Sequence, residues 1–219
     1  DYATASLAES SLARVAYRDT DAPRIEKHAQ KALEYAGANE AESNAHARRA
    51  ALHMLAWAAH TAGDMKLARQ RFNESLAFRR RTGSRLSVVS ELANLGDLAA
   101  EEGDLPEAAR ILGEAMTTSH ELGSKYMLVN MFPSIASLAA RAGLDDDAGI
   151  LFGAADASAV ASGLIADPNP PADAERDAVR SRLGEGAFAE LLAHGTSLGD
   201  DAAVARAVAA AQRVAATPE

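Results

Sequence analysis

The chain has 219 residues, of which 48% are hydrophobic, 24% charged and only 5% aromatic, and it contains no cysteine. Abundant alanine with few aromatic residues favours closely packed helices over a β-rich fold, and the lack of cysteine excludes disulfides, thiolate metal sites and cysteine nucleophiles. The net charge of −9 disfavours direct nucleic-acid contact, which depends on clustered Lys and Arg. No stretch is apolar enough to span a membrane and no signal-peptide pattern opens the chain, so we expect a cytoplasmic protein without membrane contact.

The first predicted element is a helical hairpin formed by residues 6–20 and 24–36, with Pro23 in the turn. Its predicted packing faces are Leu12, Val15 and Ala16 on the first helix and Ala29, Leu33 and Ala36 on the second. Because the chain enters helix-forming sequence directly at Asp1, we expect it to be a segment of a longer protein.

Glycines mark the turns of the next segment at a constant spacing of twenty residues. They lie at positions 63, 83, 103, 123, 143 and 163. Gly83 and Gly123 each begin a Gly-Ser-basic sequence and the other glycines do not, so two kinds of turn alternate and the repeating unit is forty residues. Apolar residues recur at that step with helical spacing, at Leu52, Leu92 and Phe132, then at Leu55, Leu95 and Ile135. Each unit leaves an apolar face that a neighbouring unit must cover, which predicts a stacked array.

Polar residues at the turns predict where helices start. Asp64 and Asp104 follow their glycines at N-cap positions, and Glu107 is placed to complete a capping box with Asp104. Pro133 falls in the first helix of the last regular unit, and it predicts that this helix either begins near Phe132 or kinks there.

The forty-residue unit resembles the tetratricopeptide repeat. The resemblance is carried by Leu52, Leu55, Ala56, Gly63, Ala68, Phe72 and Ser75, with equivalents at each forty-residue step. The unit is longer than the usual repeat of about 34 residues. The resemblance implies an all-α, tetratricopeptide-like superhelix of about four helical hairpins over residues 1–163.

The pattern changes after Gly163. Residues 164–171 contain three prolines and do not suit a helix interior. Shorter helices are predicted beyond them, at 172–183, 186–194 and 200–216. We expect residues 164–219 to form a C-terminal helical cap that gives the last repeat a water-tolerant outer surface.

A second resemblance covers roughly residues 145–212. It is carried by the run from Ile150 to Asp156, the proline-rich turn, the sequence from Leu183 to Phe188, and Ser197-Leu198 before an Ala/Val helix. Their order and spacing resemble the C-terminal end of large multidomain bacterial ATP-binding regulators, the LuxR-like and AfsR-like transcription factors. The resemblance implies that an ATPase module and a DNA-binding or effector module precede the repeats. No phosphate-binding loop occurs in the 219 residues themselves.

Polar residues between the packing positions are expected to line the concave side of the array. They are Arg14, Tyr17, His53, Trp57, His60, Asn94, Asp97, Asn130, Ser134 and Ser137. The chain's single tryptophan belongs to this set, and Trp, Tyr and Arg are the residues that binding hot spots favour. The alternative is that Trp57 packs between adjacent repeats and the polar residues are merely solvated.

Three histidines are spaced seven residues apart, at positions 46, 53 and 60. Such residues are about 10.5 Å apart along a helix, too far for imidazoles that must each reach about 2.1 Å from one zinc ion. We therefore expect groove or interface histidines, no metal site and no cofactor.

The remaining charged clusters also have structural explanations. Four arginines flank Gly83, at positions 79, 80, 81 and 85. Positive charges stabilise the C-terminal end of a helix, which is the structural explanation. The alternative is a patch that binds phosphate or docks a partner. Acids at 145, 146 and 147 suit a helix N-terminus. No facing pair of carboxylates and no nucleophile-elbow serine is evident, so we expect a protein that is not an enzyme.

These observations predict a non-catalytic interaction and effector-sensing arm of a multidomain bacterial transcriptional regulator. Its expected partner is another protein or the upstream ATPase or effector module of the same chain, with a small effector as a further candidate. The alternative function is a stand-alone tetratricopeptide adaptor that binds peptide segments of partner proteins.

Overall fold

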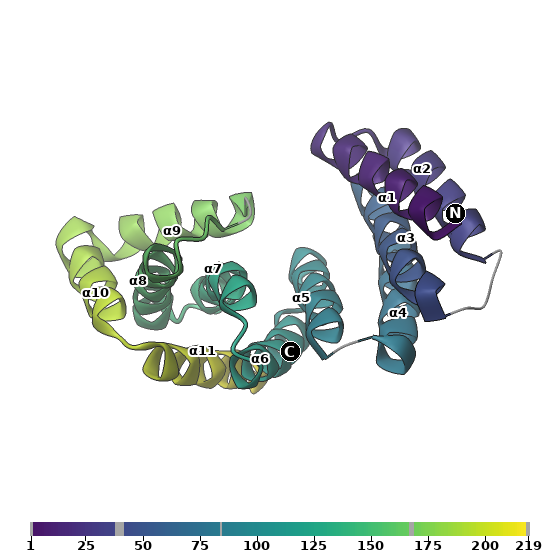
Figure 1. Ribbon diagram of the computed structural model, residues 1–219. Helices are drawn as coiled ribbons and strands as arrows, with labels where there is room; N and C mark the ends of the chain where they lie inside the picture. Colours follow the sequence, from purple (N-terminus) through teal and green to yellow (C-terminus); the bar gives the residue numbers. More distant parts are fainter. Residues whose placement is uncertain (1, 38–41, 84, 167–168, 218–219) are drawn as a thin grey trace. The chain divides into compact units, whose positions relative to one another are not determined.

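A computed structural model describes residues 2–37, 42–83, 85–166 and 169–217. Within these ranges every regular element is an α-helix, which confirms the all-α prediction (Figure 1). The helices are α1 (Tyr2–Arg18), α2 (Ala22–Gly37), α3 (Glu42–Thr61), α4 (Met65–Thr82), α5 (Arg85–Glu101), α6 (Leu105–Glu121), α7 (Lys125–Arg141), α8 (Asp145–Ser162), α9 (Pro170–Leu183), α10 (Glu185–Ser197) and α11 (Asp200–Ala215).

The chain divides into two compact units, an N-terminal unit of residues Asp1–Leu95 and a C-terminal unit of residues Gly96–Glu219. Helix α5 contributes its first part to one unit and its last part to the other. The boundary predicted after residue 163 separates α8 from α9 inside the C-terminal unit, and the division into array and cap stays a prediction.

The hairpin turns combine a left-handed residue with an N-cap side chain. Gly63, Gly103, Gly123 and Gly143 have φ between +64° and +91°, a region that suits glycine because it has no Cβ. Asp64 Oδ1 then accepts from the backbone N–H of Leu67 at 2.9 Å, and Asp104 makes the equivalent bond to Glu107 at 3.0 Å. Both predicted N-caps are confirmed.

Two details of the turns differ from expectation. The Glu107 side chain pairs with Arg110 at 2.7 Å rather than completing a capping box with Asp104. Gly83 has φ of −99°, whereas Gly123, predicted to share its kind of turn, has φ of +64° like the remaining glycines, so the predicted alternation of two kinds of turn is wrong. A Cβ there would lie 2.3 Å from Ser87 Oγ, so glycine is required at Gly83 by close approach and not by backbone conformation.

The core of the N-terminal unit lies between α1, α2 and α3. It contains Ala13, Ala16, Ile25, Ala29, Met54, Leu55 and Ala58. On α1 the buried stripe consists of Ser6, Ser10, Ala13 and Ala16. Leu12 and Val15, predicted to pack, are about half exposed at 46% and 50%. The prediction was wrong because small residues form the buried stripe of α1, turning the larger ones outward.

The core of the C-terminal unit is dominated by α7 and α8, most of whose residues are buried. Its largest fully buried side chains are Leu98, Leu112, Met116, Leu128, Met131, Phe132, Ile135, Leu138, Leu151 and Phe188. Helix α7 runs from Lys125 through Pro133 to Arg141, so the predicted alternative of a start near Phe132 is wrong.

The three predicted terminal helices are confirmed as α9, α10 and α11. Helix α10 packs closely on α8, and glycines occupy both sides of the crossing. A Cβ on Gly153 would lie 2.2 Å from the Leu192 carbonyl oxygen, and one on Gly195 would lie 1.9 Å from the Ile150 carbonyl oxygen. The absence of side chains at these two residues therefore lets the two backbones meet.

Helix α11 returns along the C-terminal unit and packs on α6, α7 and α8, beside α6 in Figure 1. Its charged residues reach acceptors on those helices. Asp147, buried at 3% exposure, accepts from Arg206 Nε at 2.6 Å and also from Arg213. Asp147 thus belongs to a helix-to-helix contact rather than serving only as the N-terminal charge predicted for α8.

Candidate recognition surface

The predicted groove residues fall in both compact units. The N-terminal unit holds Arg14, Tyr17, His53, Trp57, His60 and Asn94, and the C-terminal unit holds Asp97, Asn130, Ser134 and Ser137. The surroundings of the two sets are described separately.

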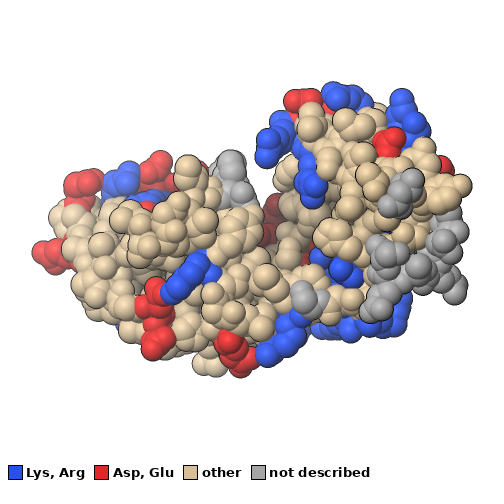
Figure 2. Space-filling model, viewed as in Figure 1, with Lys and Arg blue, Asp and Glu red and all other residues tan. Residues whose placement is uncertain are grey.

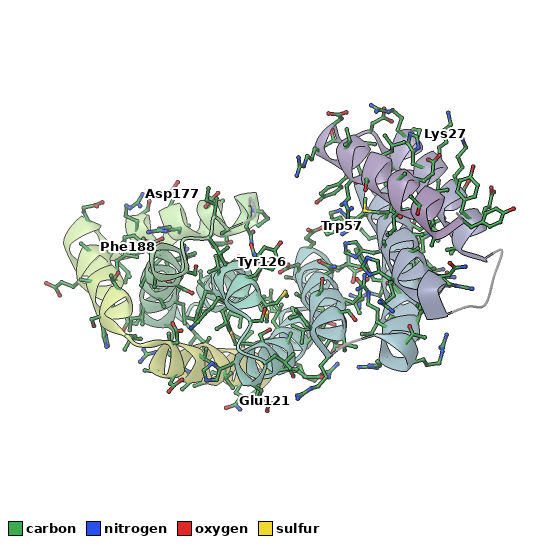
Figure 3. The ribbon with its side chains drawn as sticks, in the orientation of Figure 1. Lys27, Trp57, Glu121, Tyr126, Asp177 and Phe188 are labelled. Atoms are coloured by element: carbon green, nitrogen blue, oxygen red, sulfur yellow. The ribbon has the colours of Figure 1, made fainter. Side chains whose placement is uncertain are left out.

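Trp57 is the centre of an aromatic cluster in the N-terminal unit and remains partly exposed (Figure 3). Its ring centroid lies 4.8 Å from that of Tyr17 on α1 and 5.5 Å from that of Phe72 on α4. The His60 ring packs edge-on to it at 5.1 Å. Phe72 is fully buried whereas Tyr17 is exposed, so the cluster runs from the core to the surface. We name Tyr17, His53, Trp57 and His60 the Trp57 face; Arg14 precedes Tyr17 by three residues on α1.

A chain of hydrogen bonds fixes the orientation of the Trp57 indole. Trp57 Nε1 donates to His53 Nε2 at 3.1 Å, and His53 Nδ1 lies 3.1 Å from Glu91 Oε1. Because indole N–H is only a donor, His53 must accept at Nε2 and carry its proton on Nδ1, which donates to Glu91. The neutral form of His53 is the one that satisfies both bonds.

Glu91 is the residue on which this chain of hydrogen bonds ends. It is fully buried and accepts from Ser75 Oγ at 2.6 Å and Arg79 Nε at 2.8 Å. Burial alone raises the pKa of Glu91, but its interactions with His53, then with Arg79 and Ser75, outweigh burial and lower the pKa to about 2. Asn94 Nδ2 also donates to it at 3.2 Å. The carboxylate is therefore a fixed, ionised acceptor.

Sequence analysis did not single out Glu91. The available signal is a lone acid between apolar residues on α5, with Val89 and Leu92 buried beside it. Its equivalents at the forty-residue step are Ala51 and Met131, so the repeat pattern gives no sign of it.

The predicted residues of the C-terminal unit are less accessible. Ser134 and Ser137 are buried at 6% and 8% exposure, and α9 packs against their helix α7. Asn130 is partly buried, and its Nδ2 donates to the Tyr126 carbonyl at 3.0 Å. These residues therefore lie more within the packing between helices than on an accessible surface.

Asp97, Ser134 and Asn169 form a polar chain that ends at the start of α9. Asn169 Nδ2 donates to Ser134 Oγ at 3.3 Å, and its Oδ1 caps α9 by accepting from the Ala172 N–H at 3.1 Å. Burial raises the pKa of Asp97 to about 6, opposed by the hydrogen bond from Ser134 and reinforced by the charge of Glu101. The C-terminal part of α5 is thereby linked to the start of α9.

The three heptad-spaced histidines lie in different surroundings. His46 is exposed, His53 bonds Glu91 and His60 packs on Trp57. Over the described parts of the chain, no group of three His, Cys, Asp or Glu side chains is arranged to hold a metal ion. Nor is any helix of the described residues long and apolar enough to cross a membrane.

No protein-family model and no curated protein matches the chain. Several solved structures do match the chain. One is a kinesin light chain-related protein from Podospora anserina with nearly identical TPR-like repeats, at 16% identity and a TM-score of 0.62, covering 89% of this chain and 94% of that one. Another is aspartyl phosphate phosphatase F from Bacillus subtilis, at 13% identity and a TM-score of 0.68, covering 99% of this chain. The chain spans 61% of the length of that phosphatase. The fold is therefore a tetratricopeptide-like helical repeat.

Proposed function

We propose that the chain is a non-catalytic protein-recognition module that holds a segment of a partner protein against the Trp57 face. The observation that carries the proposal is the hydrogen-bonded chain from Trp57 through His53 to Glu91. It presents a partly exposed indole in one orientation, in a fold that stacks helices around it.

Preorganisation is what makes this surface suited to binding. An aromatic side chain that is already immobilised loses little conformational entropy when a partner packs on it. Trp, Tyr and Arg dominate binding hot spots, and Trp57, Tyr17 and Arg14 supply all three types. Tyr17 and Arg14 are exposed on α1 and add apolar contact and charge at the margin.

The wider context we propose is the C-terminal arm of a multidomain bacterial transcriptional regulator. It is supported by the sequence resemblance over roughly residues 145–212. The partner segment then belongs to the upstream ATPase or effector module of the same chain or to a separate protein. The alternative is a stand-alone adaptor. The gene sequence upstream of Asp1 separates them, since a phosphate-binding loop or helix-turn-helix there favours the regulator.

The recognition proposal is tested by selecting a random peptide library on the protein. We expect enriched sequences that share a motif, and Trp57→Ala weakens their binding at least about tenfold, the size of a hot-spot residue. Tyr126→Ala is the matched control, because Tyr126 is an exposed aromatic residue of the C-terminal unit (Figure 3). Peptides that bind wild type and Trp57→Ala equally would contradict the proposal.

A further inference from the structure

Six arginines lie in the first half of α3, in the last turn of α4 and at the start of α5. We call Arg48, Arg49, Arg79, Arg80, Arg81 and Arg85 the arginine cluster. Figure 2 shows Lys and Arg gathered along the edge of the N-terminal unit where α4 ends in Figure 1. Residues 1–95 contain 14 Lys and Arg against 11 Asp and Glu, a net charge of +3, whereas the whole chain carries −9. The negative net charge of the protein thus hides a basic N-terminal unit.

Two members of the arginine cluster are used by the fold. Arg79 donates to the buried Glu91, and Arg49 Nη1 donates to the Thr82 carbonyl at the end of α4 at 3.0 Å. Burial, followed by the charge of nearby Arg79, lowers the pKa of Arg49. The charge of Arg79 thus adds to the effect of burial, because a second positive charge nearby disfavours the protonated form.

Three other members face solvent. The guanidinium carbons of Arg48 and Arg81 lie 5.3 Å and 5.7 Å from the centroid of the Phe78 ring, so one ring positions both. Arg80, which precedes Arg81 on α4, is also exposed. No carboxylate of the described residues forms an ion pair with these three arginines. Exposed guanidinium groups are donors that pair well with carboxylates.

Helix stabilisation does not account for this arrangement. A cation near the last turn of α4 offsets the helix dipole, and that effect fades within one turn. Arg49 already serves the terminal carbonyl, and Arg48 belongs to α3 rather than to α4. Each further arginine adds repulsion between like charges. A bound anion would lower this repulsive energy.

We propose that the arginine cluster binds an acidic segment of a partner protein, with Arg48, Arg80 and Arg81 contacting its carboxylates. A short acidic segment fits the size of the cluster, since three exposed guanidinium groups match a few carboxylates. Nucleic acid fits less well, because its affinity depends on many phosphate contacts and the chain as a whole is acidic. The three exposed arginines, Arg48, Arg80 and Arg81, are not part of the Trp57 face.

The test is a titration of fluorescein-labelled octaglutamate with the protein, followed by fluorescence anisotropy at 50 and 200 mM NaCl. The test variant is Arg48→Gln/Arg80→Gln/Arg81→Gln, which keeps much of each side-chain stem. The control is Lys27→Gln/Lys31→Gln/Lys66→Gln, which removes the same charge from exposed positions of the same unit. Lys27 lies well away from the end of α4 (Figure 3). Circular dichroism at 222 nm verifies that both variants fold.

We expect wild type to bind the peptide at low salt, the arginine variant to bind at least about tenfold more weakly, and the control to change less than about twofold. Binding should weaken at 200 mM NaCl because charge attraction is screened. The proposal is overturned if wild type does not bind at 50 mM NaCl, or if both variants lose affinity equally. It is also overturned if a labelled 20-base-pair DNA duplex binds more tightly through the same three arginines.

Discussion

Thr20 occupies the turn position that glycine takes in the later hairpins. Its φ is 53°, and no other non-glycine residue in the described chain has a positive φ. Asp21 follows it and accepts from the Arg24 N–H at 3.1 Å, as Asp64 does after Gly63. The first turn is therefore built like the others although its sequence departs from the glycine pattern, and a β-branched residue is strained in this conformation.

Replacing Thr20 by Gly should raise the free energy of unfolding by about 0.5–1 kcal/mol, because glycine adopts a positive φ without a Cβ clash. Urea unfolding followed by circular dichroism measures the change. The reverse substitution, Gly63→Thr, should lower the free energy of unfolding by about 1–2 kcal/mol. A loss of stability in Thr20→Gly would show that the turn does not strain the threonine.

Asp97 should make the protein less stable as pH rises. Its pKa of about 6 lies above the ordinary 3.8, so the folded state holds the proton more tightly than the unfolded state does. The free energy of unfolding therefore falls between about pH 4 and pH 6, and Asp97→Asn should raise it at pH 7.5 by about 1–3 kcal/mol. Asparagine keeps an acceptor for Ser134. Urea unfolding of both proteins at pH 4.5 and pH 7.5 measures this; an unchanged difference between the two pH values would contradict it.

At the scale of helices, the crossing of α8 and α10 depends on two glycines that face the opposite backbone. Gly153 lies against Leu192 and Gly195 against Ile150, at distances that leave no room for a methyl group. Side-chain periodicity does not reveal such a contact, because the residues that matter have no side chain. Helix α10 thus packs on α8 through a close approach of the two backbones.

Gly195→Ala should lower the free energy of unfolding by about 1–3 kcal/mol, the usual cost of overpacking. Gly186→Ala on the same helix is the matched control, since a Cβ there meets nothing within 4 Å. That control should be neutral or stabilising by up to about 1 kcal/mol, as alanine favours helix. Thermal unfolding by circular dichroism compares the two; equal effects would mean that the crossing does not depend on Gly195.

At the scale of the whole molecule, the two compact units carry opposite net charges. The N-terminal unit carries +3, and the remaining residues carry −12, the difference between the whole-chain value of −9 and +3. The chain's single tryptophan lies in the N-terminal unit, so its fluorescence reports on that unit alone. Circular dichroism reports on the helices of both.

Glu91→Gln should therefore unfold the two units unequally. It leaves Arg79 without its buried carboxylate, which should cost the N-terminal unit about 3–5 kcal/mol. The midpoint of the urea transition followed by Trp57 fluorescence should move to a lower urea concentration. The later part of the circular dichroism transition, which reports the unfolding of the C-terminal unit, should keep its midpoint. Coincident transitions in wild type and variant would show that the chain unfolds as one cooperative unit.

The sequence by itself determined the all-α fold, the terminal helices α9, α10 and α11, and the N-caps at Asp64 and Asp104. These features depend on periodicity, turn residues and capping, which are local properties of the chain. The tetratricopeptide-like character was also predictable, because the positions of Gly63 and its equivalents repeat at a fixed step.

Only the tertiary structure decided which residues are buried and what they contact. Leu12 and Val15 face outward because small residues of α1 fill the space against α2 and α3, and Ser134 is buried because α9 packs over α7. Glu91 on α5 joins Ser75 and Arg79 of α4 and His53 of α3 into the support for Trp57. Contacts between helices far apart in the chain have no local signature, since they depend on how packed faces meet rather than on the residues of any one segment.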